Sequence, residues 1–411
     1  MIAPPFRTFV YIYFIYFLDL MGYVFAFVVL PPIIVQPEIS ILDASVSLQT
    51  RNLIIGFLLA SYPFAQFFAS LFLGELSDRF GRKKILVIST FGTFLSFWLS
   101  AVAILMKNVP LLFISRLLSG LSAGNLTVTQ AAIADWAPHD KKEQYMAFFS
   151  IAAGIGWTVG PFIAAFLSNS QITPFFNHAL PFWFLGLLFA IGFLMMVFGL
   201  KEHREITEKK SLDLHRTFEN LLGIFKFPNV KALYLSSIIG IFGWMMYQSF
   251  LAPFLIEKYH FTTQSEGYAY AVSSVFWFLG GVVTNQWLAK YFQVKRVLIL
   301  PFFISGLAIL SYLFATRSEW IWGIVSISNF CYSIVLSCFF GMFSRLVPGE
   351  YQGKLFGSWN AAFAAVCAIG PFLAGWLVRY WINLPYLVAA LMIVVISIYY
   401  LRWYMQHSKT L

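Results

Sequence analysis

Apolar runs separated by short polar segments extend along the whole chain of 411 residues. A run of about 20 residues can cross a bilayer as an α-helix, which satisfies its own backbone hydrogen bonds. The pattern therefore predicts an all-α membrane protein with twelve transmembrane helices. We expect these helices at residues 8–33, 52–73, 85–106, 110–134, 145–168, 180–200, 232–256, 268–289, 297–315, 320–344, 352–378 and 384–404.

The composition supports this class, because 60% of the residues are hydrophobic and only 11% are charged. The first run, 8–33, is too long for a signal-peptide core, and no small-residue cleavage site follows it, so we interpret it as a retained helix. Cys331, Cys338 and Cys367 all lie in apolar runs, which argues against a disulfide framework or a metal site.

The distribution of basic residues predicts the orientation in the membrane. The formal net charge is +10, but the bases lie in short loops between apolar runs, which argues against a nucleic-acid partner. Cytoplasmic loops carry an excess of Lys and Arg, so we expect both termini in the cytoplasm. That choice leaves five bases outside and one within a helix: Arg51, Lys107, Lys258, Arg317 and Arg379, and Arg116.

The longest hydrophilic segment, 201–231, divides the chain into two halves. We expect one six-helix bundle in 1–200, a cytoplasmic linker in 201–231 and a second six-helix bundle in 232–411. Within the linker, apolar residues at helical spacing predict a short amphipathic helix on the membrane surface, acting as a tether or as a regulatory element. They are Leu214, Phe218, Leu221, Leu222 and Phe225.

The two halves also repeat each other. Residues 138–167 align with 348–377, and the triplet Gly160-Pro161-Phe162 matches residues 370–372. Internal repeats of this kind are typical of transporters in which two bundles rock around a site at the middle of the membrane. The repeat therefore predicts two pseudo-symmetric bundles.

A basic polar loop, 74–84, lies between the second and third runs, with the sequence GELSDRFGRKK. It resembles the signature loop of the major facilitator superfamily, Gly-x-Leu-(Ala/Ser)-Asp-Arg-x-Gly-Arg-(Lys/Arg), at every defined position. The resemblance implies the major facilitator fold, a transport function and a network at this loop that locks the outward-open state. In that network Asp78 would accept hydrogen bonds at the start of the eleventh helix, and Arg82 would pair with Asp135. The gating candidates here are Gly74, Asp78, Arg79, Gly81, Arg82, Lys83 and Asp135.

Two charged residues, Asp19 and Arg116, lie well inside predicted membrane helices. A charge in the bilayer costs a few kcal/mol at least, so such residues usually serve a function. At 1.5 Å per residue, Asp19 lies roughly 17 Å and Arg116 about 21 Å from the cytoplasmic face, so they could meet in a cavity. A movement that separates the pair would bind or release a proton. The alternative is a permanent structural ion pair.

The contexts of both charges resemble known motifs. Asp19-Leu20-Met21-Gly22 resembles the first-helix motif of drug–proton antiporters of the tetracycline-resistance type, and residues 116–124 resemble the superfamily's fourth-helix motif. The fifth helix carries Gly154, Gly156, Gly160 and Pro161, which partly match the antiporter motif Gly-Pro-x-x-Gly-Gly. Small residues let helices approach closely and proline permits a bend, so we expect gating roles for Gly156, Gly160 and Pro161.

Polar and aromatic residues inside the predicted helices are candidates for contact with cargo. Few fixed charges accompany them, and we expect no deeply buried acid in the helices from 232 onward, which suits a moderately apolar organic compound. The candidates are Gln130, Trp157, Trp244, Tyr247, Gln248, Asn329, Ser333 and Asn360.

The resemblance and the residues together predict a proton-coupled antiporter that exports a small amphipathic organic compound across the cytoplasmic (inner) membrane. Proton-coupled uptake of a nutrient such as an amino acid, sugar or nucleoside is the main alternative, and a non-transporting receptor or assembly factor is another. An enzyme is not expected. The chain has no phosphate-binding Gly-x-x-x-x-Gly-Lys-(Ser/Thr) loop, so we expect no cofactor beyond the proton gradient, and we expect a monomer.

Overall fold

The computed structural model describes residues 6–138, 141–202, 228–284, 294–346 and 349–407, and these residues are mainly helical, with no strand among them. The chain forms two compact units. Unit 1 comprises Met1–Leu212 and Phe261–Tyr268, and unit 2 comprises Asp213–His260 and Ala269–Leu411.

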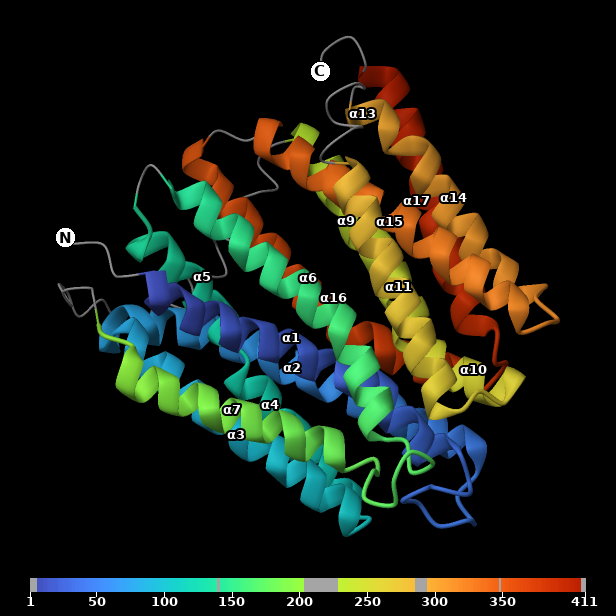
Figure 1. Ribbon diagram of the computed structural model, residues 1–411. Helices are drawn as coiled ribbons and strands as arrows, with labels where there is room; N and C mark the ends of the chain where they lie inside the picture. The colour runs from blue at the N-terminus through green and yellow to red at the C-terminus, as the bar shows by residue number, and fades with distance from the viewer. Residues whose placement is uncertain (1–5, 139–140, 203–227, 285–293, 347–348, 408–411) are drawn as a thin grey trace. The chain divides into compact units, whose positions relative to one another are not determined.

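The helices of unit 1 pair lengthwise. Among them α1 packs against α6, α3 against α7, and α2 against α4, and Figure 1 shows α3 and α7 running side by side. Most of α1 is buried, because its neighbours cover it on several sides. The helices are α1 (Phe6–Val35), α2 (Leu48–Phe80), α3 (Arg82–Leu105), α4 (Val109–Ser122), α5 (Asn125–Trp136), α6 (Lys142–Leu167) and α7 (Leu180–Gly199).

In unit 2, α9 packs against α16 and α17, and α14 packs against α15 and α17. The first turns of α11, through Tyr268, belong to unit 1 and the remainder to unit 2. The elements are α9 (Pro228–Ser249), α10 (Leu251–Tyr259), α11 (Thr263–Val283), α13 (Val294–Val297), α14 (Ile299–Leu310), the 3-10 turn η4 (Ser311–Leu313), α15 (Glu319–Leu346), α16 (Gly349–Val378) and α17 (Leu384–His407).

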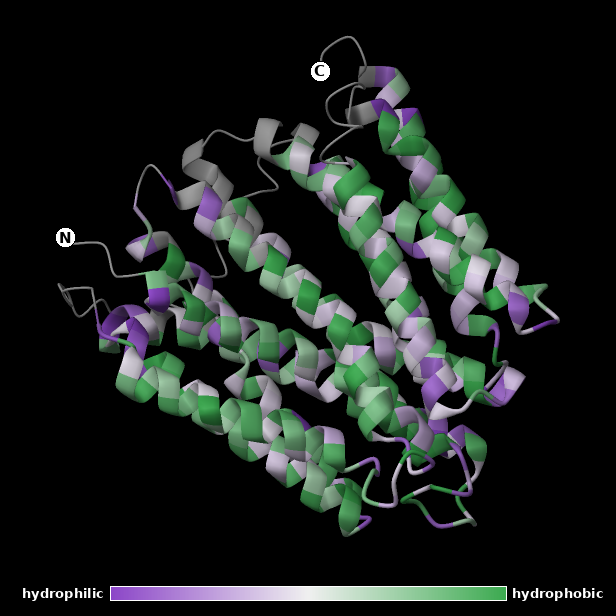
Figure 2. Ribbon diagram, in the orientation of Figure 1, coloured by the Kyte–Doolittle hydropathy of each residue, from purple (hydrophilic) through white to green (hydrophobic). Residues whose placement is uncertain are grey.

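Most of the helices are long and apolar enough to cross a membrane. Within the described residues nine helices meet that condition, and the bent pair α9–α10 makes a tenth. Figure 2 shows that hydrophobic residues predominate along the helices. Within the described residues each predicted membrane segment falls on a helix, with α4 and α5 together forming the fourth, α11 the eighth, and α14 with η4 the ninth. The twelve-helix all-α prediction is therefore confirmed.

The internal repeat has a packing counterpart in each unit. In α6, a side chain at Gly160 would lie 3.3 Å from Met21 of α1, and in α16 one at Gly370 would lie 3.4 Å from Met245 of α9. A proline follows each glycine inside its helix. The predicted domain boundaries stay predictions, and the expected amphipathic helix at 214–225 lies outside the described residues.

A break between α9 and α10 interrupts the seventh membrane segment with a bend of 42°. At the break the Tyr270 hydroxyl donates to the Gln248 carbonyl (3.0 Å) and accepts from the Ala252 amide (3.4 Å). These two backbone groups are four residues apart and would bond each other in an unbroken helix. The buried Tyr270 hydroxyl therefore replaces one helical hydrogen bond and satisfies both groups where water is scarce.

Replacing Tyr270 with Phe tests this role. The change leaves a buried amide and a buried carbonyl without their partner, at about 1–3 kcal/mol for each group. We expect a clear drop in the thermal unfolding midpoint of the purified protein. Tyr332→Phe is the matched control, because Tyr332 is equally buried in unit 2 but its hydroxyl makes no hydrogen bond among the described residues. Equal midpoints for the two variants would contradict the assignment.

Candidate functional site

The polar turn between α2 and α3 depends on Gly81. Its φ of 95° lies in a region that side chains disfavour, and its N–H donates to the Ser77 carbonyl to close the end of α2 (3.1 Å). The chain then enters α3 directly at Arg82. Gly81 thus sets the sharp angle that turns the Arg82 side chain back toward α2.

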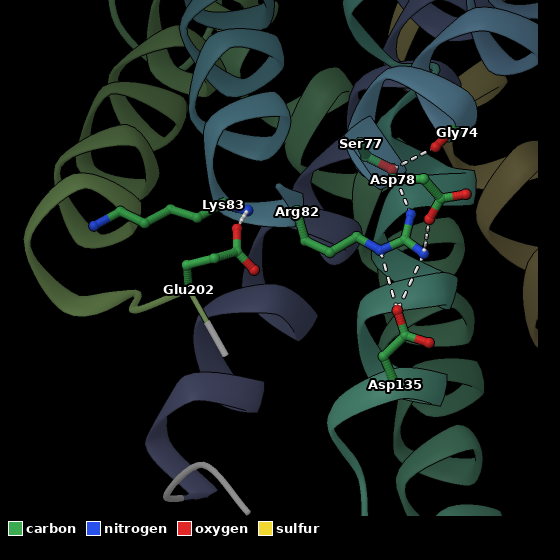
Figure 3. Close-up of polar contacts among 7 residues, drawn as sticks. All are labelled: Gly74, Ser77, Asp78, Arg82, Lys83, Asp135 and Glu202. Atoms are coloured by element: carbon green, nitrogen blue, oxygen red, sulfur yellow. Dashed lines mark hydrogen bonds and ion pairs between the residues drawn. The ribbon is translucent and has the colours of Figure 1, made fainter. Parts of the chain in front are cut away.

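Arg82 joins three helices, as Figure 3 shows. Its Nη2 lies 2.7 Å from an oxygen of Asp78 on α2 and 3.1 Å from an oxygen of Asp135 on α5. Its Nη1 donates to the hydroxyl of Ser77, which itself donates to the Gly74 carbonyl (2.6 Å). The guanidinium is buried while both acids are partly exposed. The predicted pairing of Arg82 with Asp135 is therefore present, and Ser77 is an additional partner.

The next residue, Lys83, ties this turn to the end of α7. Its Nζ donates to the Val197 carbonyl (2.9 Å), and its backbone N–H donates to the Glu202 carboxylate (2.9 Å; Figure 3). The N-terminus of a helix carries a partial positive charge, so a carboxylate at the start of α3 is favourable. A side chain at Gly81 would lie 2.5 Å from the same carboxylate, so the glycine also makes room for Glu202.

The remaining gating candidates of the loop have simpler surroundings. Gly74 lies beside α5, where a Cβ would stand 3.9 Å from Thr127 Oγ1, an ordinary contact distance. Arg79 is exposed and lies over the ring of Phe80. The expected contact of Asp78 with the eleventh helix stays a prediction.

Asp19 on α1 and Arg116 on α4 are both buried inside unit 1, at 7% and 1% exposure. They form no ion pair with each other, and neither Asp19 oxygen, Arg116 Nε nor Arg116 Nη1 has a hydrogen-bond partner among the described residues. The amide of Asn125 on α5 is near Asp19 without hydrogen-bond geometry. The sequence therefore predicts the burial of both charges correctly, while the direct pairing is absent.

Tyr62 on α2 lies near both charges. The Arg116 guanidinium stands over its ring at 5.1 Å from the centroid, and Asp19 is close enough to act on it electrostatically. Gly120, one turn after Arg116, makes this approach possible, because a Cβ there would collide with the Tyr62 carbonyl. Tyr23 joins the Tyr62 ring to Trp157, with centroids 5.3 and 5.6 Å apart.

Two glycines of α6 pack against the helix that carries Asp19. A Cβ at Gly156 would lie 2.7 Å from the Phe17 carbonyl, and one at Gly160 would lie 3.3 Å from Met21 Cγ. Phe17 and Met21 flank Asp19 on α1. These contacts form a seam between α1 and α6 that lies just before Pro161. A shift or bend of α6 would therefore act directly on the surroundings of Asp19.

The cargo candidates of unit 2 are mostly interior. The Tyr247 hydroxyl is within 3.4 Å of donors or acceptors on Tyr312, Ser328 and Asn329, and both Tyr247 and Asn329 are fully buried. Trp244 lies 4.6 Å from Trp277, ring to ring. The others are distributed as follows: Gln248 donates to Ser273 (3.1 Å), Ser333 is buried, Asn360 is exposed, and Gln130 of unit 1 is partly exposed.

One expectation about buried acids is wrong. Glu266 in the first turn of α11 is fully buried, and neither of its carboxylate oxygens has a hydrogen-bond partner among the described residues. The sequence places residue 266 two positions before a predicted helix, in an external loop, because the polar residues 262–266 interrupt the apolar pattern. The helix begins earlier, at Thr263, and its first turns pack into unit 1.

The sequence also misses three partners in addition to Ser77. Tyr62 and Asn125 are ordinary residues of membrane helices, and only the fold brings them to Asp19 and Arg116. Glu202 follows the sixth membrane segment directly, and an acid at that point, in a chain with a basic loop at 74–84, is a weak signal for the observed contact.

The fold and this site define a polytopic membrane protein of the transporter class. The family model of the Major Facilitator Superfamily matches residues 12–357 and 233–410. The chain therefore belongs to the major facilitator superfamily.

Several characterised proteins are similar to this chain. Multidrug resistance protein 2 of Bacillus subtilis (strain 168) is 27% identical over 359 residues, covering 83% of this chain and 84% of the relative. Tetracycline resistance protein, class B, of Escherichia coli is 26% identical over 328 residues, with 77% of each chain covered. The crystal structure of a D-xylose–proton symporter matches with a TM-score of 0.75 at 16% identity, covering 96% and 97% of the two chains.

Arg82→Lys tests whether the guanidinium fork holds the turn together. A lysine cannot reach Ser77, Asp78 and Asp135 in the same geometry. Because the acids are partly exposed, we expect a loss of about 1–2 kcal/mol, well below that of a dry ion pair. The thermal midpoint checks this, with Arg79→Lys on the exposed neighbour as control. A loss in the control as large as in Arg82→Lys would contradict the assignment.

Gly156→Ala tests the seam between α1 and α6. The new methyl would meet a backbone carbonyl 2.7 Å away, so the helices must separate, at about 1–3 kcal/mol. Gly160→Ala meets the flexible Met21 side chain and should cost clearly less. Thermal unfolding of the two variants compares them directly, and the reverse order would show that the seam is placed wrongly.

Proposed function

We propose that the protein is a proton-coupled exporter of small amphipathic organic compounds, working by antiport. The relatives named for multidrug and tetracycline resistance support the export of organic compounds. The partly matched glycine motif of α6 supports exchange. The protein would lie in the cytoplasmic membrane with both termini in the cytoplasm, as the basic loops predict.

The observation that carries the proposal is Asp19, an acid in the interior of unit 1 with no ion-pair partner among the described residues. An ionised carboxylate there needs a partner or water, whereas a protonated one does not. Asn125 and Tyr62 lie near the carboxyl without bonding it, and Arg116 stands over the Tyr62 ring. A small movement of α1 would therefore change the balance between its two protonation states, which couples proton binding to conformation.

The contact of α1 with α6 gives that movement a route. Gly156 packs on the Phe17 carbonyl, so a shift of α6 moves the backbone beside Asp19. At the polar turn, Arg82 and Lys83 hold α2, α3, α5 and the end of α7 together. In the proposed cycle this network is the lock of one end state and the α1–α6 seam transmits the change. Gln130 and Trp157 remain candidates for contact with cargo in unit 1, and the interior polar residues remain candidates in unit 2.

Uptake by symport is the second candidate. The D-xylose–proton symporter has the same fold, and a fold does not fix the direction of transport. Asp19 could serve in either scheme. Export and uptake differ in whether the cargo moves against or with the proton.

Asp19→Asn tests the coupling. Purified protein would be placed in vesicles with an acidic interior, and internal pH would be followed while amphipathic compounds such as ethidium, a tetracycline and a fluoroquinolone are added. Antiport predicts proton release from the lumen for the wild type and its loss in Asp19→Asn, because the amide cannot titrate. Asp43→Asn, at an exposed loop acid, should behave as wild type.

Three outcomes would separate the alternatives. Entry of cargo together with protons would favour symport. Unchanged proton release in Asp19→Asn would remove Asp19 from the coupling while leaving antiport in place. Cargo movement that ignores the pH gradient in the wild type would exclude proton coupling altogether.

A further inference from the structure

Glu266, like Asp19, is a buried acid without a partner among the described residues. It is 0% exposed, neither carboxylate oxygen accepts a hydrogen bond, and it takes part in neither ion pair of the described residues. Glu319 also lies in the first turn of its helix, α15, and is exposed. A first-turn acid is therefore not buried by default in this fold, and an isolated buried carboxylate is strongly disfavoured in its ionised form.

The segment that carries Glu266 is held tightly against unit 1. A Cβ at Gly267 would collide with the Ala165 side chain and would lie 3.2 Å from the Pro161 carbonyl of α6. Before the helix, the Phe261 carbonyl accepts from Gln36 Nε2 at 3.0 Å. These contacts close the segment 261–268 over the Glu266 side chain and keep it from water.

The described contacts of this segment supply no positive charge. His178, from the loop before α7, lies 3.2 Å from the Thr263 hydroxyl, one turn before Glu266. Burial lowers the pKa of His178 to about 4, so its ring is neutral near pH 7. The contacts from α6 and from the end of α1 come from residues that do not titrate: Pro161, Ala165 and Gln36. The titratable neighbours on the same stretch of chain, His260 and Tyr268, are exposed.

We propose that Glu266 is a proton-binding site that fastens the first two turns of α11 onto α6. The carboxyl is neutral while the segment is closed on unit 1. When the segment lifts, water reaches the carboxyl and the proton leaves. This site is separate from Asp19 and its existence does not depend on the direction or the cargo of transport.

Glu266 and His178 give the closed state of the segment opposite dependences on pH. Rising pH removes the proton of Glu266 and favours the lifted segment. Falling pH favours the lifted segment through His178, whose pKa is about 4 when closed and about 6.5 when exposed to water. The His178 contribution to closure is therefore complete above about pH 6.5 and is lost as the pH falls toward 4. The closed state of segment 261–268 should therefore be most stable at pH values between the protonation of His178 and the deprotonation of Glu266.

Hydrogen–deuterium exchange of the purified full chain in lipid nanodiscs measures the lifting without any cargo. Peptides covering 261–268 and 170–180 should lose protection as the pH rises above neutral, by up to about ten-fold per pH unit after correction for intrinsic exchange. In Glu266→Gln the side chain is neutral and of equal size, so the loss of exchange protection with rising pH (the alkaline slope) should vanish. Glu319→Gln should keep the slope of the wild type.

Infrared spectroscopy reports the proton itself. The wild type at neutral pH should show the carbonyl stretch of a protonated carboxylic acid that Glu266→Gln lacks and Glu319→Gln retains. His178→Gln should keep the alkaline slope and lose the acid one. If Glu266→Gln fails to fold, Glu266→Asp must retain the slope. A wild type without the slope, or a Glu266→Gln variant that keeps it, would overturn the proposal.

Discussion

Polar groups buried among apolar helices must find partners inside the protein, because the hydrocarbon of a bilayer offers none. Most of this chain obeys that constraint closely. The Tyr270 hydroxyl fills the gap where α9 breaks, and Arg82 meets Ser77, Asp78 and Asp135 together. The exceptions are therefore informative. Among them, Asp19, Arg116 and Glu266 are buried ionisable residues with polar atoms that make no hydrogen bond within the described part of the chain.

These exceptions are placed where helices meet through small residues. Gly156 sets α6 against the backbone on either side of Asp19, Gly120 sets α4 against Tyr62, and Gly267 sets the first turns of α11 against α6. A glycine contact brings backbones close without interlocking side chains, so it permits sliding or separation at modest cost. Buried ionisable groups beside such contacts join protonation to helix movement. The well-bonded Arg82 network, by contrast, holds the ends of several helices in one arrangement.

The sequence predicts the fold of this protein well, because membrane helices are marked by their length and apolarity. The positions of Asp19 and Arg116 in helix interiors and the pairing of Arg82 with Asp135 also follow from spacing and from the loop pattern. The sequence alone does not predict which distant side chains the fold brings into contact. Tyr62 contacts Arg116 because of the approach at Gly120, and no periodicity marks it. The burial of Glu266 is not predicted, because the polar residues at the beginning of a buried helix have the same sequence pattern as a loop.

The central claim is that proton binding at Asp19 and cargo binding oppose each other. It is tested most directly in unbuffered detergent solution, by adding a compound that the vesicle assay shows to be carried and recording the pH. We expect that cargo releases protons from the wild type, that the release fades at a pH where Asp19 is already ionised, and that Asp19→Asn releases none. Cargo binding without proton release at any pH would contradict the claim.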